Sequence, residues 1–381
     1  MKWIADQSAL DEALGAIGDA PAFAIDTEAD SLHSYFDKVC LIQISANGED
    51  LLVDPLARIE LAALGTLLAD VTVRKVFHGA DYDLRILNRD FGFEVRNLFD
   101  TMVASQLLGY EALGLAALLK RHFGLEVDKS HQRADWAQRP LPRALRDYAV
   151  NDTHYLLGLA TILEGELRAA GRWEWASEEF ERLEAIRFAP QETDPDAWRR
   201  VKGSNRLEAR GLAVVERLHA FRDRIARELD RPPFKVLNNE AIVTLATQLP
   251  RSANELRAIK GMSGWIVRQW GPDILAVVEE VVSLSEEALP KKQPSKVWQR
   301  DKDLERRIER LKKVRDRVAT DLKIDPAVLA PKHVLASVAA LDPREVAALE
   351  GVPTLRRWQK SLLGEAFVEA LGGTQNAERR T

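Results

Sequence analysis

Short apolar runs alternate with polar turns in the first hundred residues, and this pattern predicts β-strands. The runs Ala22 to Asp26, Val39 to Ala46 and Leu51 to Val53 each have the length of one strand. The pair Asn47-Gly48 separates the last two, and Asn-Gly between apolar runs is a strong hairpin signal. We therefore expect a sheet that begins with antiparallel strands.

Helical spacing becomes more frequent farther along the chain. Residues 61–68 have the pattern of a helix, residues 71–77 that of another strand, and the spacing after Phe99 is mostly helical. This order predicts an α/β domain whose mixed sheet is flanked by helices. From about residue 205 onward no segment has a convincing strand pattern.

The helical half of the chain contains an internal repeat. Residues 218–226 resemble residues 311–319, and residues 259–262 resemble residues 349–352. Each copy is long enough for a small helical domain. The stretch from Leu289 to Ser295 has the composition of a linker between them.

Length and composition fit this division into domains. A chain of 381 residues is expected to form two or three domains. No apolar run reaches the roughly 18 residues of a membrane-spanning helix, so we expect no membrane association. The single cysteine, Cys40, permits no internal disulfide bond and fits the reducing cytoplasm.

Charge is distributed unevenly along the chain. The net charge of −5, taken globally, argues against a nucleic-acid binder. However, residues 199–235 contain eleven Lys and Arg against five Asp and Glu, and residues 291–317 contain twelve against five. Two such segments would attract phosphates, although each could also be a solvated helix face.

Asp26 and Glu28 are the first candidates for chemistry. They follow an apolar strand, and residues i and i+2 of a strand share a face. Two adjacent carboxylates raise one another's pKa unless a cation lies between them, and hard oxygen ligands suit Mg²⁺ or Mn²⁺. The alternative is an ordinary strand end at the surface.

Asp152 lies on a helical stripe that is otherwise apolar apart from the hydroxyl of Tyr148. A buried acid is costly unless it is paired or bound to metal, and Tyr148, one turn earlier, shares its face. A buried Asp that caps a helix or pairs with Arg is the alternative. The stripe consists of Leu145, Tyr148, Ala149, Asp152, Leu156 and Leu159.

Two further acids, Asp81 and Asp83, fall in the first turns of a helix that should begin near Gly79. Asp81 precedes Arg85 by four residues, so a surface ion pair is its simplest interpretation. His78 is a possible base or ligand, but a hydrogen bond at the strand–helix junction is the simpler expectation. The residues alone do not choose between Asp81 and Asp83.

Taken together, three segments resemble the exonuclease motifs of the ribonuclease D family, the DEDDy branch of the 3′→5′ exonucleases. They are Ile25-Asp26-Thr27-Glu28, His78-Gly79-Ala80-x-x-Asp83 and Tyr148-Ala149-Val150-Asn151-Asp152. The two repeated modules resemble HRDC domains. The resemblance implies a ribonuclease H-like exonuclease domain over residues 1–200, followed by HRDC-like domains over 205–288 and 300–373.

The same resemblance implies a role for each matching residue. Asp26, Glu28, Asp83 and Asp152 would hold two divalent metal ions, Mg²⁺ or Mn²⁺, which favours Asp83 over Asp81. Tyr148 would orient the attacking water. The implied reaction releases 5′-monophosphates from RNA 3′ ends, and the implied substrates are tRNA precursors with 3′ extensions.

The HRDC resemblance also implies contacts with nucleic acid. The candidate phosphate contacts are Arg222, Arg224, Lys235, Arg315 and Arg317. Asp223 and Asp316 lie beside some of them, so ion pairs on solvated helix faces are the alternative.

Three other functions compete with an exoribonuclease. A DNA 3′→5′ exonuclease would use the same acids, but the HRDC-like modules favour RNA. An inactive RNA-binding scaffold is disfavoured because all four acids and the tyrosine are present. A helicase is disfavoured because the chain has no Gly-x-x-x-x-Gly-Lys-Ser/Thr loop, and we therefore expect no nucleotide cofactor.

Overall fold

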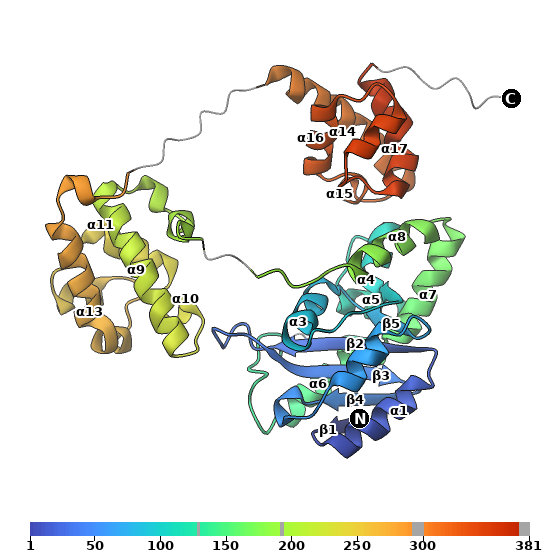
Figure 1. The fold of residues 1–381 in the computed structure, drawn as a ribbon, viewed down its shortest axis with the longest axis horizontal. Helices are drawn as coiled ribbons and strands as arrows, with labels where there is room; N and C mark the ends of the chain where they lie inside the picture. Colours follow the sequence, from blue (N-terminus) through green and yellow to red (C-terminus); the bar gives the residue numbers. More distant parts are fainter. Residues whose placement is uncertain (128–129, 191–193, 292–300, 373–381) are drawn as a thin grey trace. The chain divides into compact units, whose positions relative to one another are not determined.

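The computed structural model describes residues 1–127, 130–190, 194–291 and 301–372 (Figure 1). The chain divides into two units by its contacts. The first unit combines residues 1–28, 39–188 and 298–381, and the second combines residues 29–38 and 189–297. The predicted linker from Leu289 to Ser295 falls partly outside the described residues.

A six-stranded mixed sheet forms the centre of the N-terminal domain, with the strand order β1-β4-β3-β2-β5-β6. Strands β3 and β4 are antiparallel, with Gln43 opposite Leu52, whereas the pairs β1–β4, β2–β5 and β5–β6 are parallel. The strands are β1 (Lys2–Ile4), β2 (Ala22–Ala29), β3 (Val39–Ala46), β4 (Glu49–Val53), β5 (Arg74–Phe77) and β6 (Leu98–Asp100).

The hairpin predicted at Asn47-Gly48 is confirmed, and both residues adopt positive φ angles, of 51° and 77°. The strand predicted over residues 71–77 begins later, at Arg74. The reason is local, because the Asp70 carboxylate accepts hydrogen bonds from the backbone N–H and the hydroxyl of Thr72. That turn holds residues 70–72 out of the sheet.

Helices flank this sheet, as the sequence predicts (Figure 1). Helix α6 packs on β3 and β4, helix α7 on β5, and helix α8 on β6. The helical elements are α1 (Gln7–Gly18), η1 (Pro55–Ala57), α2 (Ala62–Ala69), α3 (Asp81–Phe91), α4 (Thr101–Leu108), α5 (Leu115–Phe123), α6 (Arg143–His154), α7 (Leu156–Ala169) and α8 (Trp173–Glu184).

The second unit is a helical domain built around α9, which packs on α11 and α13. Residues 29–38, the segment between β2 and β3, belong to this unit. The backbone N–H groups of Tyr35 and Phe36 each donate to Asp230 at 2.9 Å, and the Tyr35 hydroxyl donates to Asp223 at 2.8 Å. Its elements are η2 (Ala197–Arg200), η3 (Ser204–Arg206), α9 (Ala209–Glu228), α10 (Pro233–Val236), α11 (Asn239–Gln248), α12 (Ala253–Ala258), α13 (Gly264–Ser283) and η4 (Glu286–Ala288).

A second helical domain within the first unit repeats this architecture. Arg222 donates to the carbonyl oxygen of Leu237 at 3.1 Å, and Arg315, 93 residues later, donates to that of Ala330 at 3.0 Å. Across residues 205–291 and 301–372 the structure contains no strand. Its elements are α14 (Lys302–Leu322), α15 (Pro326–Leu329), α16 (Lys332–Leu341), η5 (Val346–Gly351) and α17 (Arg357–Ala370).

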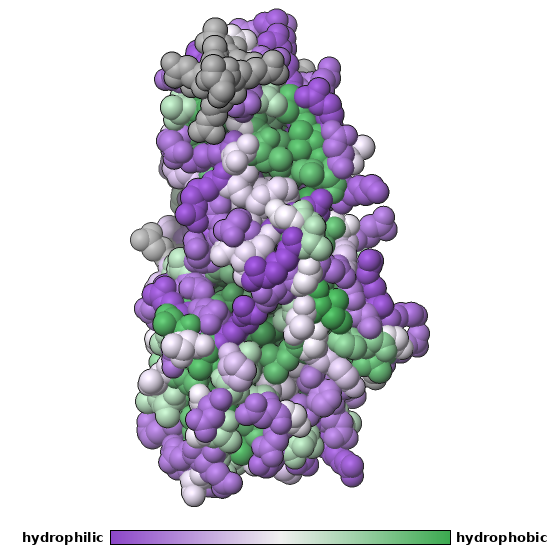
Figure 2. All heavy atoms as spheres, turned by 90° about the vertical axis from the view of Figure 1, so that its right-hand side faces the viewer, coloured by the Kyte–Doolittle hydropathy of each residue, from purple (hydrophilic) through white to green (hydrophobic). Residues whose placement is uncertain are grey.

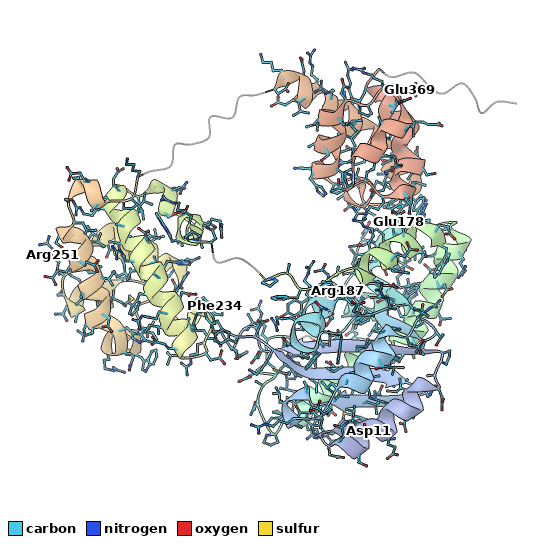
Figure 3. The ribbon with its side chains drawn as sticks, viewed as in Figure 1. Asp11, Glu178, Arg187, Phe234, Arg251 and Glu369 are labelled. Atoms are coloured by element: carbon cyan, nitrogen blue, oxygen red, sulfur yellow. The ribbon has the colours of Figure 1, made fainter. Side chains whose placement is uncertain are left out.

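Helix α8 provides a carboxylate to this second helical domain. Glu178, labelled in Figure 3, accepts hydrogen bonds from the backbone N–H groups of Arg357 and Trp358 at 2.8 and 3.0 Å. N–H groups in the first turn of a helix such as α17 have no acceptor within the helix, and a negative charge is favourable there.

Hydrophilic side chains are spread over the face of the molecule shown in Figure 2, with hydrophobic ones in smaller groups among them. None of the helices within the described residues combines the length and the apolar character needed to cross a bilayer.

Candidate active site

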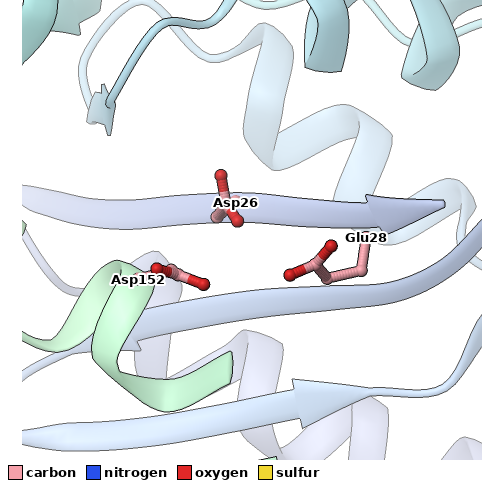
Figure 4. Close-up of side chains that lie close together, drawn as sticks. All are labelled: Asp26, Glu28 and Asp152. Atoms are coloured by element: carbon pink, nitrogen blue, oxygen red, sulfur yellow. The ribbon is translucent and has the colours of Figure 1, made fainter. Parts of the chain in front are cut away.

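Three carboxylates from two elements converge beside the sheet (Figure 4). Asp26 and Glu28 alternate with Thr27 along β2, and Asp152 comes from helix α6. One carboxylate oxygen from each acid lies within 4.8 Å of the other two. The spacing of two along a strand, together with a helix packed across that strand, is what brings the three together.

Asp83 joins this group through Thr27. It lies in the first turn of α3 and is buried, and its carboxylate accepts a hydrogen bond from the Thr27 hydroxyl. Thr27 stands between Asp26 and Glu28 on β2. Asp83 is therefore beside the three-acid group, although its oxygens are not part of it.

Asp81 faces a different environment from Asp83. Its side chain is exposed and forms a two-pronged ion pair with Arg85, with N–O distances of 2.8 and 3.0 Å. The surface ion pair predicted for Asp81 is confirmed. The geometry thus separates two acids that the residue pattern left equivalent.

The start of α3 is held by a carboxylate at the end of the neighbouring strand. Asp100, the last residue of β6, accepts from the backbone N–H groups of Gly79 and Ala80 at 3.0 and 2.8 Å and also caps α4. Gly79 has a φ of +79°, and an added Cβ would lie 3.2 Å from the Met102 side chain. His78 contacts Thr101 at 2.9 Å, so the hydrogen bond expected at this junction is confirmed.

Tyr148 lies one turn before Asp152 on α6 and is 8% exposed. Its ring packs against two side chains from the preceding segment, His131 in an edge arrangement at 5.7 Å and Trp136 in a tilted one at 6.1 Å between centroids. Burial is the main reason that the pKa of its hydroxyl lies above the usual range, and the neighbouring Asp152 and Glu28 charges add to it. The hydroxyl therefore keeps its proton and is available as a hydrogen-bond donor.

A cavity of about 330 Å³ opens over the acids. Sequence reasoning did not identify Gln132, Gly114 or Ala116 as part of it, because they come from loops and a helix end with no local signal. The cavity is lined by Asp26, Glu28, His78, Gly114, Leu115, Ala116, Val127, Gln132, Tyr148 and Asp152.

Burial disfavours negative charge on all four acids, and repulsion by other acids of the set adds to it for Asp26 and Glu28. Burial raises the pKa of Asp83 and of Asp152 to about 7. Burial, followed by the charges of Asp152 and Asp83, raises the pKa of Glu28 to about 9. Burial and the three other acids hold the pKa of Asp26 well above its usual range.

This arrangement fits a divalent metal centre. The charges that act on Asp26 and Glu28 are other carboxylates, so the ionised cluster lacks a compensating charge. A bound cation would supply that charge, and carboxylate oxygens are the ligands that Mg²⁺ and Mn²⁺ prefer. The 4.8 Å limit on the oxygen separations is close enough for a shared ion.

The candidate phosphate contacts fall into two groups. Arg222 and Arg315 are buried, and the guanidinium group of each donates a hydrogen bond to a carbonyl oxygen inside its own domain. Arg224, Lys235 and Arg317 are exposed. Buried guanidinium groups that already donate to carbonyl oxygens are poorly placed for phosphates, so the structure favours the exposed group.

Comparison with known families assigns a domain type to most of the chain. The model of the 3'-5' exonuclease family matches residues 1–168, which include all four acids and Tyr148. The HRDC domain model matches twice, over residues 211–278 and 305–371.

Curated relatives match along most of their length. The chain is 31% identical over 352 residues to the ribonuclease D of Nitrobacter hamburgensis, covering 91% of this chain and 88% of the relative. It is 32% identical over 357 residues to the ribonuclease D of Gluconacetobacter diazotrophicus, covering 91% and 86%.

Solved structures agree with these relatives. Escherichia coli RNase D, an exoribonuclease involved in structured RNA processing, is 27% identical with a TM-score of 0.65, covering 97% of this chain and 98% of that one. The catalytic core of RRP6 from Trypanosoma brucei is 30% identical with a TM-score of 0.67, covering 74% of this chain and 79% of that one. Identity above 30% over nine-tenths of the chain shows that this protein belongs to the ribonuclease D family of 3′→5′ exoribonucleases.

Proposed function

We propose that this 3′→5′ exoribonuclease removes nucleotides one at a time by two-metal-ion hydrolysis and releases 5′-monophosphates. Asp26, Glu28, Asp83 and Asp152 are the proposed metal ligands. The observation that carries the proposal is the convergence of three carboxylates under one cavity, with Asp83 tied to them through Thr27.

Each part of the cavity has a role in this proposal. Two divalent ions held by Asp26, Glu28, Asp83 and Asp152 would supply the positive charge that activates a water and stabilises the oxygens of an in-line displacement. Tyr148, protonated and held by its aromatic neighbours, donates a hydrogen bond that orients the water. Leu115 and Ala116 offer an apolar wall of the cavity to the terminal nucleotide.

The proposed substrates are tRNA precursors with extra 3′ residues. The family supports RNA as the substrate class. The two HRDC domains support it further, since such modules extend the surface available to a structured RNA. Either Mg²⁺ or Mn²⁺ suits the all-carboxylate ligand set.

The test is release of nucleotides from a 3′-end-labelled tRNA precursor, with and without metal. Wild-type protein should release labelled monophosphate only with Mg²⁺ or Mn²⁺, and Asp83→Asn should abolish release. Asp81→Asn is the matched control, because Asp81 lies two residues away on the same helix but faces solvent. Equal turnover by Asp83→Asn and wild type would contradict the ligand assignment.

A matched pair of RNA and DNA oligonucleotides separates this function from the DNA exonuclease. We expect faster degradation of the RNA. Faster degradation of the DNA would favour the alternative, and binding of RNA without any degradation in the presence of Mg²⁺ or Mn²⁺ would favour an inactive scaffold.

We also propose Arg224, Lys235 and Arg317 as phosphate contacts, on the basis of their exposure. The proposed domains are residues 1–200, 205–288 and 300–373, although residues 189–200 cluster with the second unit by their contacts. The ends of η4 at Ala288 and of α17 at Ala370 support the last two, although residues 300 and 373 themselves lie outside the described residues. A cytoplasmic location remains a prediction from the single cysteine, which is buried.

A further inference from the structure

Gln43, in the middle of β3, has a buried amide with no hydrogen-bond partner. Its side chain is fully buried, and neither Nε2 nor Oε1 reaches a donor or acceptor. Burying an amide without partners is unfavourable, and such groups are rare in folded proteins. An amide kept in this state calls for a partner that the protein chain alone does not supply.

The side chain of Gln43 faces helix α6. Its cross-strand partner Leu52 belongs to the same hydrophobic cluster as Tyr148 and Ala149 of α6. Two residues further along β3, on the same face, the Ser45 hydroxyl lies 2.7 Å from that of Thr153, which follows Asp152. Gln43 therefore lies in the layer between the sheet and the helix that carries Tyr148 and Asp152.

The acids on β2 face the same layer between the sheet and α6. Strand β3 lies between β4 and β2 in the sheet. Asp26 and Glu28 on β2 share a carboxylate cluster with Asp152, so they also face α6. Gln43 thus lies on the strand next to β2, beside the proposed metal ligands, and is not among the residues that line the cavity.

We infer that Gln43 is a positioning residue of the metal centre, whose amide bonds the ligand carboxylates, directly or through an ordered water, when metal is bound. The inference rests on the proposed function, since it needs a metal at the acids. An amide offers both a donor and an acceptor, so it can meet an ionised carboxylate and a water at once. Partners that orient metal ligands typically contribute 10–100-fold to metal affinity.

The experiment measures Mn²⁺ binding to the full-length protein by titration calorimetry, without RNA. Gln43→Leu and Gln43→Met keep most of the side-chain volume but remove the amide. Both should weaken Mn²⁺ binding by about 10–100-fold. They should also raise the melting temperature of the metal-free protein, because an unpartnered amide has been removed.

Ile44→Met is the matched control. Ile44 is equally buried on the same strand but faces the opposite side of the sheet, so its change repacks β3 without touching the α6 layer. It should leave Mn²⁺ affinity unchanged. An equal loss of affinity in Ile44→Met would make the effect one of strand packing and overturn the inference.

The possible failures are distinguishable. If wild-type protein does not bind Mn²⁺, the proposed function fails. If wild type binds Mn²⁺ and both Gln43 variants bind it equally well, only the role of Gln43 fails. Failure of both variants to fold would also overturn the inference, because the amide would then be essential to the metal-free fold.

Discussion

At the scale of single residues, the acids of this site oppose the stability of the fold that holds them. Asp152 is half-buried on α6 within reach of Asp26 and Glu28, and its removal from water raises its pKa to about 7. A structural acid would instead be paired with a cation, which would lower its pKa. The cost of the cluster is therefore a reason to assign it a function.

Asp152→Asn should separate function from stability. If Asp152 is a metal ligand, turnover of RNA should fall by more than the roughly 10–100-fold that loss of a ligand's hydrogen-bond partner costs. The melting temperature of the metal-free protein should rise, because one of the repelling charges disappears. Asp147→Asn, at an exposed position of the same helix, should change neither quantity. A loss of both activity and stability in Asp152→Asn would favour a structural acid instead.

Tyr148→Phe removes one hydroxyl and retains the ring that packs against Trp136. If the hydroxyl orients the attacking water, kcat should fall by about 10²-fold or more, while KM and Mn²⁺ affinity change little. Steady-state kinetics and calorimetry on the same preparations check this. A change confined to KM would mean that Tyr148 binds the nucleotide rather than the water.

At the scale of elements, the carboxylate of Asp100 links two strand–helix junctions, the one between β5 and α3 and the one between β6 and α4. Asp100 accepts four backbone hydrogen bonds, from Gly79 and Ala80 before α3 and from Met102 and Val103 in α4. It therefore fixes where α3 begins. The position of Asp83 depends on a residue seventeen places later in the chain.

Asp100→Ala should lower the free energy of unfolding by about 3 kcal/mol, because several buried donors lose their acceptor. It should also weaken Mn²⁺ binding, since α3 carries Asp83. Asp6→Ala removes an exposed cap of α1, where the carboxylate accepts from Ala9 at 2.9 Å, and should cost about 1 kcal/mol without affecting Mn²⁺. Urea denaturation and calorimetry test both; equal Mn²⁺ affinities in the two variants would contradict the role of Asp100.

The elements were more predictable from the sequence than the site. The β3–β4 hairpin follows from local periodicity and an Asn-Gly turn, and the helical repeat follows from similarity at a fixed offset. The residue pattern did not decide between Asp81 and Asp83, because both stand in the first turn of α3. The folded structure separates them, since Asp83 is buried against Thr27 whereas Asp81 is exposed and paired with Arg85.

Two glutamines show which other site residues the sequence could and could not have indicated. Gln43 interrupts the apolar run Leu41 to Ile44, and a polar residue in a buried strand was a signal that sequence reasoning could have used. Gln132 gave no such signal, because it stands in a polar loop and reaches the cavity only through the path of the chain between α5 and α6.

At the scale of the whole molecule, the acids set how stability depends on pH. Their pKa values in the folded protein lie above those of the unfolded chain, at about 7 for Asp83 and Asp152 and about 9 for Glu28. Between pH 4 and 9 these acids therefore bind more protons in the folded state than in the unfolded state. Their contribution to stability falls as pH rises through this window.

The metal-free protein should accordingly melt at a higher temperature at pH 5 than at pH 8. Saturating Mg²⁺ should reduce that difference, because the metal favours the ionised acids. Melting curves in EDTA and in Mg²⁺ across this range test the prediction. The double variant Asp26→Asn, Asp152→Asn should flatten the EDTA profile; an unchanged slope would place its origin in other groups.

Salt dependence tests how the basic helical domains contribute to RNA binding. If Arg224, Lys235 and Arg317 each neutralise a phosphate, their combined change to Ala should reduce the slope of log K against log[salt] by about 2, since each contact to a single strand contributes about 0.7.

The control changes Lys2, Arg58 and Lys120, three exposed cations of the exonuclease domain, to Ala. The control variant alters the net charge by the same amount. An equal change of slope in both variants would therefore mean that the slope depends on the net charge of the protein and not on phosphate contacts of the first three side chains. Because the proposed metal ligands belong to the exonuclease domain, the first variant should weaken binding while kcat at saturating RNA stays near the wild-type value. A fall in kcat without any change in slope would instead mean that these side chains act on the reaction and do not anchor the RNA.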